Sequence, residues 1–316
     1  MGKEEVKELK YRGRFGQTFI YLGKLFRLFI LQSDWKVLPM SAIIAAMVSM
    51  AIGKGLFVSM EGTFQAAFAL ACVCIWNGFF NSIQSICRER AIIKREHRSG
   101  LHVTSYILAH LIYQMFLCAL QAAITIAVCS QMGVAYPKAG VLGGDFMTEY
   151  FITLFLITYA ADVLALMISA IVHTPMAAMT VMPFMLIVQL VFAGFFTLPD
   201  MLNDVSDLMV SRWGVQGLCV LADYNNLPAT VVWNKLVESG KNIEAGGVTV
   251  KDIMAIAEKE GYRDEILEKL GESNRRDDFA ATEENLMACW GHLILFVIVF
   301  SVVTIVFLEF IDRDKR

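Results

Sequence analysis

Residues 149–172 read EYFITLFLITYAADVLALMISAIV, a run in which only Glu149 and Asp162 are charged. A helix of about 20 mostly apolar residues crosses a bilayer core, because it satisfies its own backbone hydrogen bonds where no water is present. The stretch therefore predicts a membrane-spanning helix. The whole chain agrees, since 57% of its 316 residues are hydrophobic and 18% are charged, against about 25% charged in soluble domains.

Five further runs on either side of this stretch also qualify as spans. The six predicted spans are 37–58, 63–86, 103–132, 149–172, 176–198 and 289–311. The first is the weakest, because Gly53, Lys54 and Gly55 interrupt it. Its basic leader has no early apolar core with a cleavage site, so it is not expected to be a secretory signal peptide. We therefore expect an all-α membrane protein with six transmembrane helices.

Positive charge predicts the orientation of these spans. The segment before the first span carries 8 Lys and Arg, the second loop carries 5 and the segment after the last span carries 3, whereas the first and third loops carry 1 each. Lys54, near the end of the first span, is counted with the first loop. Positive residues in short loops stay on the cytoplasmic side. Both termini and the second loop are thus predicted to be cytoplasmic in a multi-pass protein of the cell membrane. Residues 199–288 then face outside, with 17 Asp and Glu against 9 Lys and Arg.

The predicted organisation has four parts. Residues 1–36 form a cytoplasmic tail with an amphipathic helix, 37–198 the first five spans, 199–288 a large external region, and 289–316 the sixth span with a cytoplasmic tail. The amphipathic helix has an apolar face that suits the headgroup region of a membrane. That face consists of Phe15, Phe19, Leu22, Phe26 and Phe29.

The external region is predicted to contain two helices. Thr249 to Gly261 has the pattern of a helix capped at its N-terminus, and Glu265 to Leu270 is expected to follow as another. The region is either a folded external cap or a receptor for a substrate or partner.

The second loop, Arg88 to Gly100, is rich in charge and is predicted to form a short cytoplasmic helix that Gly100 ends. One interpretation is a solvated, positive turn that anchors the third span. The other is a docking element, because Arg and Glu on a short rigid helix offer directional ion pairs to a soluble partner.

Four motifs in register resemble the membrane domain of type 2 ABC exporters of the G subfamily, especially their bacterial relatives. The chain is similar to that family in the motifs Trp76-Asn77-Gly78-Phe79-Phe80-Asn81-Ser82 with Arg88-Glu89-Arg90, Arg95-Glu96-His97-Arg98-Ser99-Gly100, Gly194-Phe195-Phe196 with Ser211-Arg212-Trp213-Gly214, and the connecting helix Gln17 to Trp35.

The resemblance implies a coupling helix at 88–100 that sits on an ATP-binding subunit. The residues implied in coupling are Arg88, Glu89, Arg90, Arg95 and Glu96. It also implies two membrane subunits, as a homodimer or heterodimer, with a transport path lined by spans two and five at the dimer axis. The candidate lining residues are Asn77, Phe80, Gln189 and Phe192. Packing within the bundle is the alternative role for each of these Phe residues.

The chain departs from the family pattern in lacking the phosphate loop G-x-x-x-x-G-K-[ST]. We therefore expect no catalysis by these residues and no cofactor on them, with ATP and magnesium held by a partner ATPase, which is either another polypeptide or a further domain. No metal site and no nucleic-acid partner are expected, whereas membrane lipid is an expected partner. Cys219 and Cys289 are the two cysteines on or near the outside, and a disulfide between them is left open.

Asp162 is the acidic residue near the middle of a span, where a carboxylate is costly unless it is paired or protonated. It is either a proton site or a structural residue that is hydrogen-bonded to Asn77, Gln114 or Gln121. His110 and His173 are expected to have packing or interface roles, because no second ligand stands beside either at metal-binding spacing.

Two functions follow from these observations. The first is a permease subunit of an ATP-driven exporter for an amphipathic or lipid-like molecule. The alternative is a membrane-anchored scaffold or receptor that uses the acidic external region to bind a partner. An intramembrane enzyme is disfavoured, because no pair of carboxylates and no Ser-Lys or His-rich group lies at membrane depth in a recognisable spacing.

Overall fold

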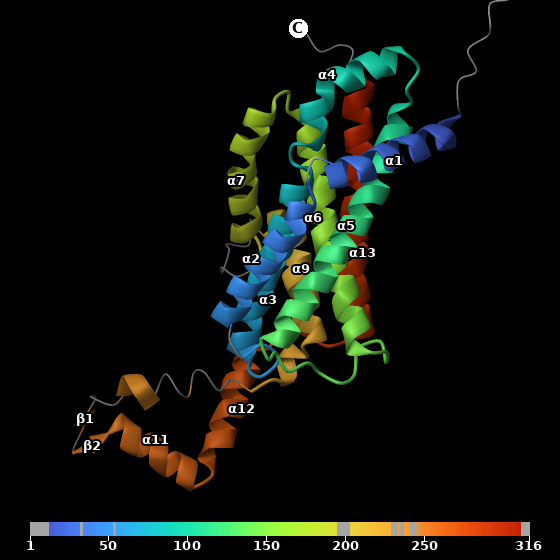
Figure 1. The fold of residues 1–316 in the computed structure, drawn as a ribbon. Helices are drawn as coiled ribbons and strands as arrows, with labels where there is room; N and C mark the ends of the chain where they lie inside the picture. The colour runs from blue at the N-terminus through green and yellow to red at the C-terminus, as the bar shows by residue number, and fades with distance from the viewer. Residues whose placement is uncertain are drawn as a thin grey trace, which may run out of the picture.

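Long helices lie side by side in a bundle, with shorter helices at both ends (Figure 1). The computed structural model describes residues 13–31, 34–52, 55–194, 203–228, 233, 237–240, 244–245 and 247–310. The bundle consists of α2 (Val37–Ile52), α3 (Met60–Ser82), α5 (Val103–Gln131), α6 (Phe146–Ile171), α7 (Pro175–Val191), α9 (Val210–Leu221) and α13 (Glu283–Glu309). One end carries α1 (Arg14–Leu31) and α4 (Ser85–Arg98), and the opposite end carries α11 (Val250–Lys259) and α12 (Tyr262–Asn274).

Short elements join the helices. They are the 3₁₀ turns η1 (Asp34–Lys36), η4 (Tyr224–Asn226) and η6 (Asp277–Phe279), the helix α8 (Asn203–Asp207), and the antiparallel strands β1 (Glu244–Ala245) and β2 (Val248–Thr249).

Five helical segments among the described residues are long and apolar enough to cross a membrane. They correspond to η1 with α2, to α3 with α4, and to α5, α6 and α13. The predicted all-α membrane fold is thereby confirmed. The place of the predicted fifth span is taken by α7, an apolar helix of 17 residues with Pro183 inside it. Residues 195–198 of that predicted span lie outside the described residues.

The centre of the bundle is α6, which is buried between α3, α5, α9 and α13. Every side chain from Ala160 to Leu166 is buried. Helix α3 approaches α6 closely at Gly78, where a Cβ atom would lie 2.5 Å from the Thr158 carbonyl oxygen and 2.6 Å from the Asp162 nitrogen. The two backbones are therefore in direct contact at this level.

Two predicted boundaries were wrong. The first span was expected to continue to Val58, but α2 ends at Ile52 and the chain turns before α3. Phe57 has a left-handed φ of 63° in this turn, and its ring packs edge-on against Phe146, with centroids 5.2 Å apart. The second predicted span, 63–86, likewise breaks after Ser82, so that α4 begins at Ser85 rather than at Arg88.

Helix α9 lies inside the bundle. Its sequence belongs to the stretch 199–288, which was expected to form an extracytoplasmic region. It packs against α3, α6 and α13, and a Cβ atom on Gly214 would lie 3.0 Å from Ile157 of α6. With only 12 residues, α9 is too short to register as a span by hydropathy. Its apolar side chains are buried against the other helices instead of facing water.

Both helices that the sequence predicts within residues 249–270 are present, as α11 and α12. Thr249 caps α11, and a full capping box is present because the Thr249 and Asp252 side chains each accept a hydrogen bond from the other's backbone amide. These bonds from Thr249 lower the pKa of Asp252. The second helix is longer than predicted, since α12 begins at Tyr262, directly after Gly261 with its φ of 83°.

Candidate functional site

Helix α4 crosses the end of the bundle where α13 ends (Figure 1). Its side chains Ile86 and Ile93 are buried in one cluster with Leu308 of α13. The backbone amides of Ile86 and Cys87 donate to Ser169 Oγ of α6 over 3.0 and 3.1 Å. Such amides in the first turn have no acceptor within their own helix. Buried contacts and hydrogen bonds therefore fix α4 to the bundle.

The five residues implied in coupling lie on two faces of α4. Arg88 and Arg95 are exposed, and their separation of seven residues, two helical turns, places them on one outward face. Glu89, Arg90 and Glu96 are partly buried and bond to the bundle or to α1. Hence the outward pair is accessible to a partner, whereas the other three hold α4 in place.

Arg90 caps the end of α6. Its Nη1 atom donates to the Ala170 carbonyl oxygen at 2.7 Å and to the Val172 carbonyl oxygen at 3.5 Å. The last carbonyl groups of a helix lack partners within it and carry partial negative charge, so a guanidinium is favoured there. Arg90 therefore links α4 to the turn between α6 and α7.

Helix α1 is joined to α4 along its length. Lys24 Nζ lies 3.2 Å from the Glu89 Oε2 atom, and the Tyr21 hydroxyl donates to the Glu96 carboxylate. Burial, together with this carboxylate, raises the pKa of Tyr21. Gln17 also links α1 to the end of α4. Its side-chain amide donates to the Gly100 carbonyl oxygen at 3.1 Å and accepts from the His102 backbone amide at 3.0 Å.

Sequence reasoning missed Tyr21 and Lys24 as partners of α4. The available signal was the basic, polar side of the amphipathic helix, on which Lys24 lies, opposite the phenylalanines. The phenylalanines of that apolar face have two kinds of surroundings in the structure. Phe15 and Phe19 are 79% and 70% exposed, whereas the ring of Phe26 packs edge-on against Tyr113 of α5, with centroids 5.5 Å apart.

The four candidate lining residues have different surroundings. Asn77 is buried and donates to Ser41 Oγ at 3.0 Å. Gln189 is also buried, and its side-chain oxygen accepts from the Ser211 backbone amide at 3.0 Å. Phe192 follows the last residue of α7 and is partly buried. Of the four, Phe80 is the exposed one, at 46%.

Asp162 is completely buried, and the structure gives it none of the three expected partners. Asn77 bonds to Ser41, Gln114 donates to Ser82 Oγ at 2.7 Å, and Gln121 exchanges two hydrogen bonds with Asn81. The three predicted partners were therefore wrong, because each of these amide groups bonds to another side chain in the packed bundle. Among the described residues neither Asp162 carboxylate oxygen has a hydrogen bond.

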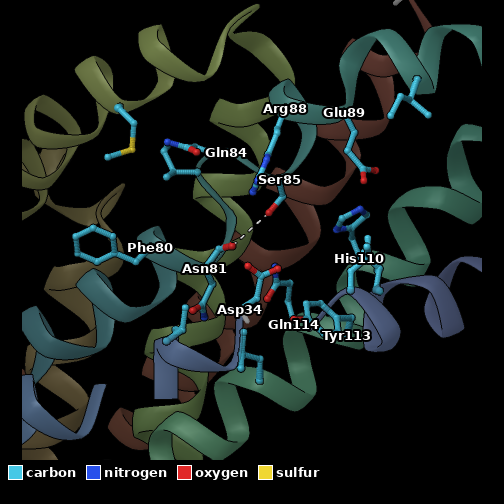
Figure 2. A pocket seen from close by; sticks show the side chains of 17 residues that line it. Asp34, Phe80, Asn81, Gln84, Ser85, Arg88, Glu89, His110, Tyr113 and Gln114 are labelled. Carbon is cyan, nitrogen blue, oxygen red and sulfur yellow. Dashed lines mark hydrogen bonds between the residues drawn. The ribbon is translucent and has the colours of Figure 1, made fainter. Parts of the chain in front are cut away.

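A pocket of about 490 Å³ lies between α1, α3, α4 and α5, and Asn81 and Gln114 belong to its wall. Figure 2 shows its polar side chains, which are Asp34, Asn81, Gln84, Ser85, Arg88, Glu89, His110, Tyr113 and Gln114. Apolar side chains complete the wall, among them Leu25 and Leu28 of α1 and Met179 of α7. The pocket is thus amphipathic, and three helices contribute polar groups to it.

His110 belongs to this pocket, although the sequence favoured a packing role for it. The residue is only 3% exposed, and neither ring nitrogen has a hydrogen-bond partner among the described residues. Gln114, at 2% exposed, likewise has no donor for its Oε1 atom. Neither residue was predicted to line a pocket, because both lie within the apolar run of α5.

The described residues hold no group of three or more His, Cys, Asp or Glu that is placed to bind a metal ion. Cys219 of α9 and Cys289 of α13 are both buried, and each is a free thiol. The disulfide that the sequence left open is therefore absent from this pair.

Comparison with known families identifies most of the bundle. The family described as ABC-2 type transporter matches residues 20–221, a range that runs from α1 through α9 and contains α4 and the pocket. No curated protein matches the chain.

Proposed function

Because the chain belongs to the ABC-2 type transporter family, we propose that it is the permease subunit of an exporter in which a separate ATPase docks on α4. Membership makes the chain a multi-pass membrane permease of an ABC transporter, a component that moves cargo and is not itself catalytic. The family also implies an ATPase subunit and a dimeric assembly. The cargo, the direction of transport and the docking surface are our proposals.

The outward face of α4 is the observation that carries the docking proposal. Arg88 and Arg95 are exposed there, with Ile92 between them at 39%. An apolar side chain flanked by two guanidinium groups suits a protein interface, where Arg is enriched and gives directional pairs with carboxylates. We infer that this face binds an acidic groove on the ATPase.

The inward contacts of α4 explain how motion at this face would reach the spans. Ser169 and Arg90 tie α4 to the end of α6, and Glu89 ties it to α1. A displacement of α4 would therefore move the central helix α6 and the peripheral helix α1 together. ATP binding and hydrolysis on the partner, with its magnesium ion, would supply the free energy for alternation between inward and outward states.

Docking of the ATPase on α4 would also fix the orientation of the chain in the membrane. The end that carries α1 and α4 would face the cytoplasm, in agreement with the positive charge of the segments there. The arm of α11 and α12 would then lie outside the cell membrane. We propose an amphipathic or lipid-like cargo, because Phe80 and the neighbouring Trp76 present exposed aromatic surface, at 46% and 39%, on the side of α3.

Reversal of charge on the outward face tests the docking proposal. In Arg95→Glu, we expect ATP hydrolysis stimulated by the permease to fall by about tenfold or more, because a like charge meets an acidic partner at the interface. The measurement compares ATPase activity and transport in proteoliposomes. The matched control is Lys251→Glu, a charge reversal at another exposed position, on α11 at the other end of the molecule.

Both variants are expected to insert normally, since neither residue is buried. Full stimulation and transport by Arg95→Glu would contradict the docking surface. Purification of the chain from its host without any ATPase would contradict the permease assembly and would favour the receptor alternative.

A further inference from the structure

The pocket between α1, α3, α4 and α5 contains buried polar groups that nothing in the described part of the chain satisfies. His110 has two such nitrogen atoms and Gln114 one such oxygen atom, and both residues line the pocket. Buried polar groups in native proteins are nearly always hydrogen-bonded to protein, water or a ligand. Together they offer a donor and acceptors to a polar group that enters the cavity.

The charges around the pocket are balanced. Figure 2 shows Arg88 pointing from α4 toward Ser85 and Asn81, with Asp34 on the far side of Asn81. Glu89, the other acidic residue in the wall, already lies 3.2 Å from Lys24. One cation and one anion therefore remain to face a ligand. A ligand with both charges can form charge-assisted hydrogen bonds with both Arg88 and Asp34, whereas a ligand with a single charge can pair with only one of them.

The surroundings indicate where the ligand comes from. Leu25 and Leu28 of the amphipathic helix α1 form part of the wall, and Phe15 and Phe19 of the same helix are exposed. An amphipathic helix with exposed aromatic residues lies at the level of lipid headgroups. The amphiphiles at this depth are phospholipids, and their zwitterionic headgroups carry a phosphate and an amine.

We propose that this pocket binds the headgroup of a zwitterionic phospholipid with a primary amine. The phosphate lies at Arg88 and His110, the ammonium lies at Asp34, and Gln114 accepts a hydrogen bond from the headgroup. The acyl chains leave along the apolar wall that Leu25 and Leu28 provide. Arg88 and Phe80 line this pocket and also belong to the surfaces proposed for the ATPase and the cargo, so the site is tested on the chain alone, with neither ATPase nor transport in the assay.

Native mass spectrometry of the purified, detergent-solubilised chain tests this site without an ATPase present. The probes are short-chain phosphatidylethanolamine, phosphatidylglycerol with the same acyl chains, and soluble phosphoethanolamine. We expect phosphatidylethanolamine to bind most tightly. Arg88→Gln and His110→Leu should each weaken its binding by about tenfold, the effect of one lost charge-assisted or buried hydrogen bond.

Two variants provide matched controls. Arg95→Gln removes the same charge from the same helix outside the pocket, and should bind phosphatidylethanolamine as the unmodified chain does. His110→Gln keeps a donor and an acceptor, and should bind better than His110→Leu. If His110→Leu fails to fold, the comparison of Arg88→Gln with Arg95→Gln still decides, because both residues are exposed.

Equal binding by Arg88→Gln and Arg95→Gln would overturn the site. Equal or tighter binding of phosphatidylglycerol would overturn the zwitterionic assignment. Binding of phosphoethanolamine as tight as that of the lipid would overturn the membrane source, because the apolar wall would then contribute nothing.

Discussion

Gly78 is the residue on which the centre of the bundle depends. A methyl group on its Cα would approach the Thr158 carbonyl oxygen and the Asp162 nitrogen to 2.5 and 2.6 Å, and both atoms belong to the backbone of α6. Backbone atoms in a packed helix cannot move aside as the end of a flexible side chain can. Small residues at helix contacts let membrane helices approach closely in this way.

Replacement of Gly78 by alanine is therefore expected to destabilise the protein. Overpacking of a core costs about 1–3 kcal/mol, which should appear as a lower unfolding temperature of the detergent-solubilised chain. The control is Gly291→Ala in α13, where no atom lies within 4 Å of the new methyl group and helix propensity favours alanine by about 1 kcal/mol. Equal unfolding temperatures for the two variants would contradict the close contact of α3 and α6.

Sequence reasoning reached this residue only as part of a motif. The stretch Trp76 to Ser82 resembled the family pattern, but nothing in it showed that Gly78 faces Thr158, because that contact joins residues far apart in the chain. The same limit applied to Asp162. Its position at membrane depth was readable from the apolar run, whereas the partners of Asn77 and Gln114 depended on how the helices pack.

At the scale of elements, the pairing of α1 with α4 is the feature most open to experiment. Lys24 and Glu89 form the ion pair between them, with side chains 35% and 22% exposed, so solvent screens part of their attraction. We expect a coupling free energy of about 1 kcal/mol or less in a double-mutant cycle. The larger expected effect is on transport, since under the proposed coupling this pair would transmit motion between α1 and α4.

Charge exchange separates these effects. Lys24→Glu alone places two carboxylates together and should reduce transport, and the double variant Lys24→Glu with Glu89→Lys should restore it. The measurement is transport in proteoliposomes, with Arg27→Glu, on an exposed position of α1, as the control. A double variant that is no better than the single one would show that the identity of each residue matters, and not their pairing.

The elements themselves were predictable to different degrees. α1, α11 and α12 followed from periodicity and capping residues, because those signals are local. The start of α4 was missed, since the break after Ser82 lies within a continuous run of helix-forming residues. No helix was predicted at the position of α9, because an apolar helix of 12 residues is too short to be recognised as a span.

The whole molecule leaves apolar surface on several sides, and one side is expected to meet a second subunit. On α7, Met176, Phe184 and Ile187 are 82%, 65% and 57% exposed. On α13, Ile298 is 55% exposed. The family resemblance places spans two and five at the dimer axis, so we expect α7 to face the partner subunit and α13 to face lipid.

Cysteine cross-linking distinguishes the two sides. In a background with Cys72 replaced, because the other native cysteines are buried, Phe184→Cys should form a dimer on oxidation and Ile298→Cys should not. The products are separated on a denaturing gel without reductant. Cross-linking through Ile298→Cys, with none through Phe184→Cys, would place the interface on α13.

At this scale the sequence predicted the membrane class and the family, because composition and long apolar runs determine them. It did not predict the pocket. A cavity arises where α1, α3, α4 and α5 fail to fill the space between them, and that depends on side-chain packing of segments that are distant in sequence.

Pro183 gives α7 a mechanical property that bears on the pocket. Proline has no amide hydrogen, so the helix lacks the bond that would otherwise reach back to the carbonyl oxygen of Met179, four residues earlier. The Met179 side chain lines the pocket. The missing hydrogen bond thus weakens α7 beside the cavity, and bending of the helix at this position would change the volume available to a bound headgroup.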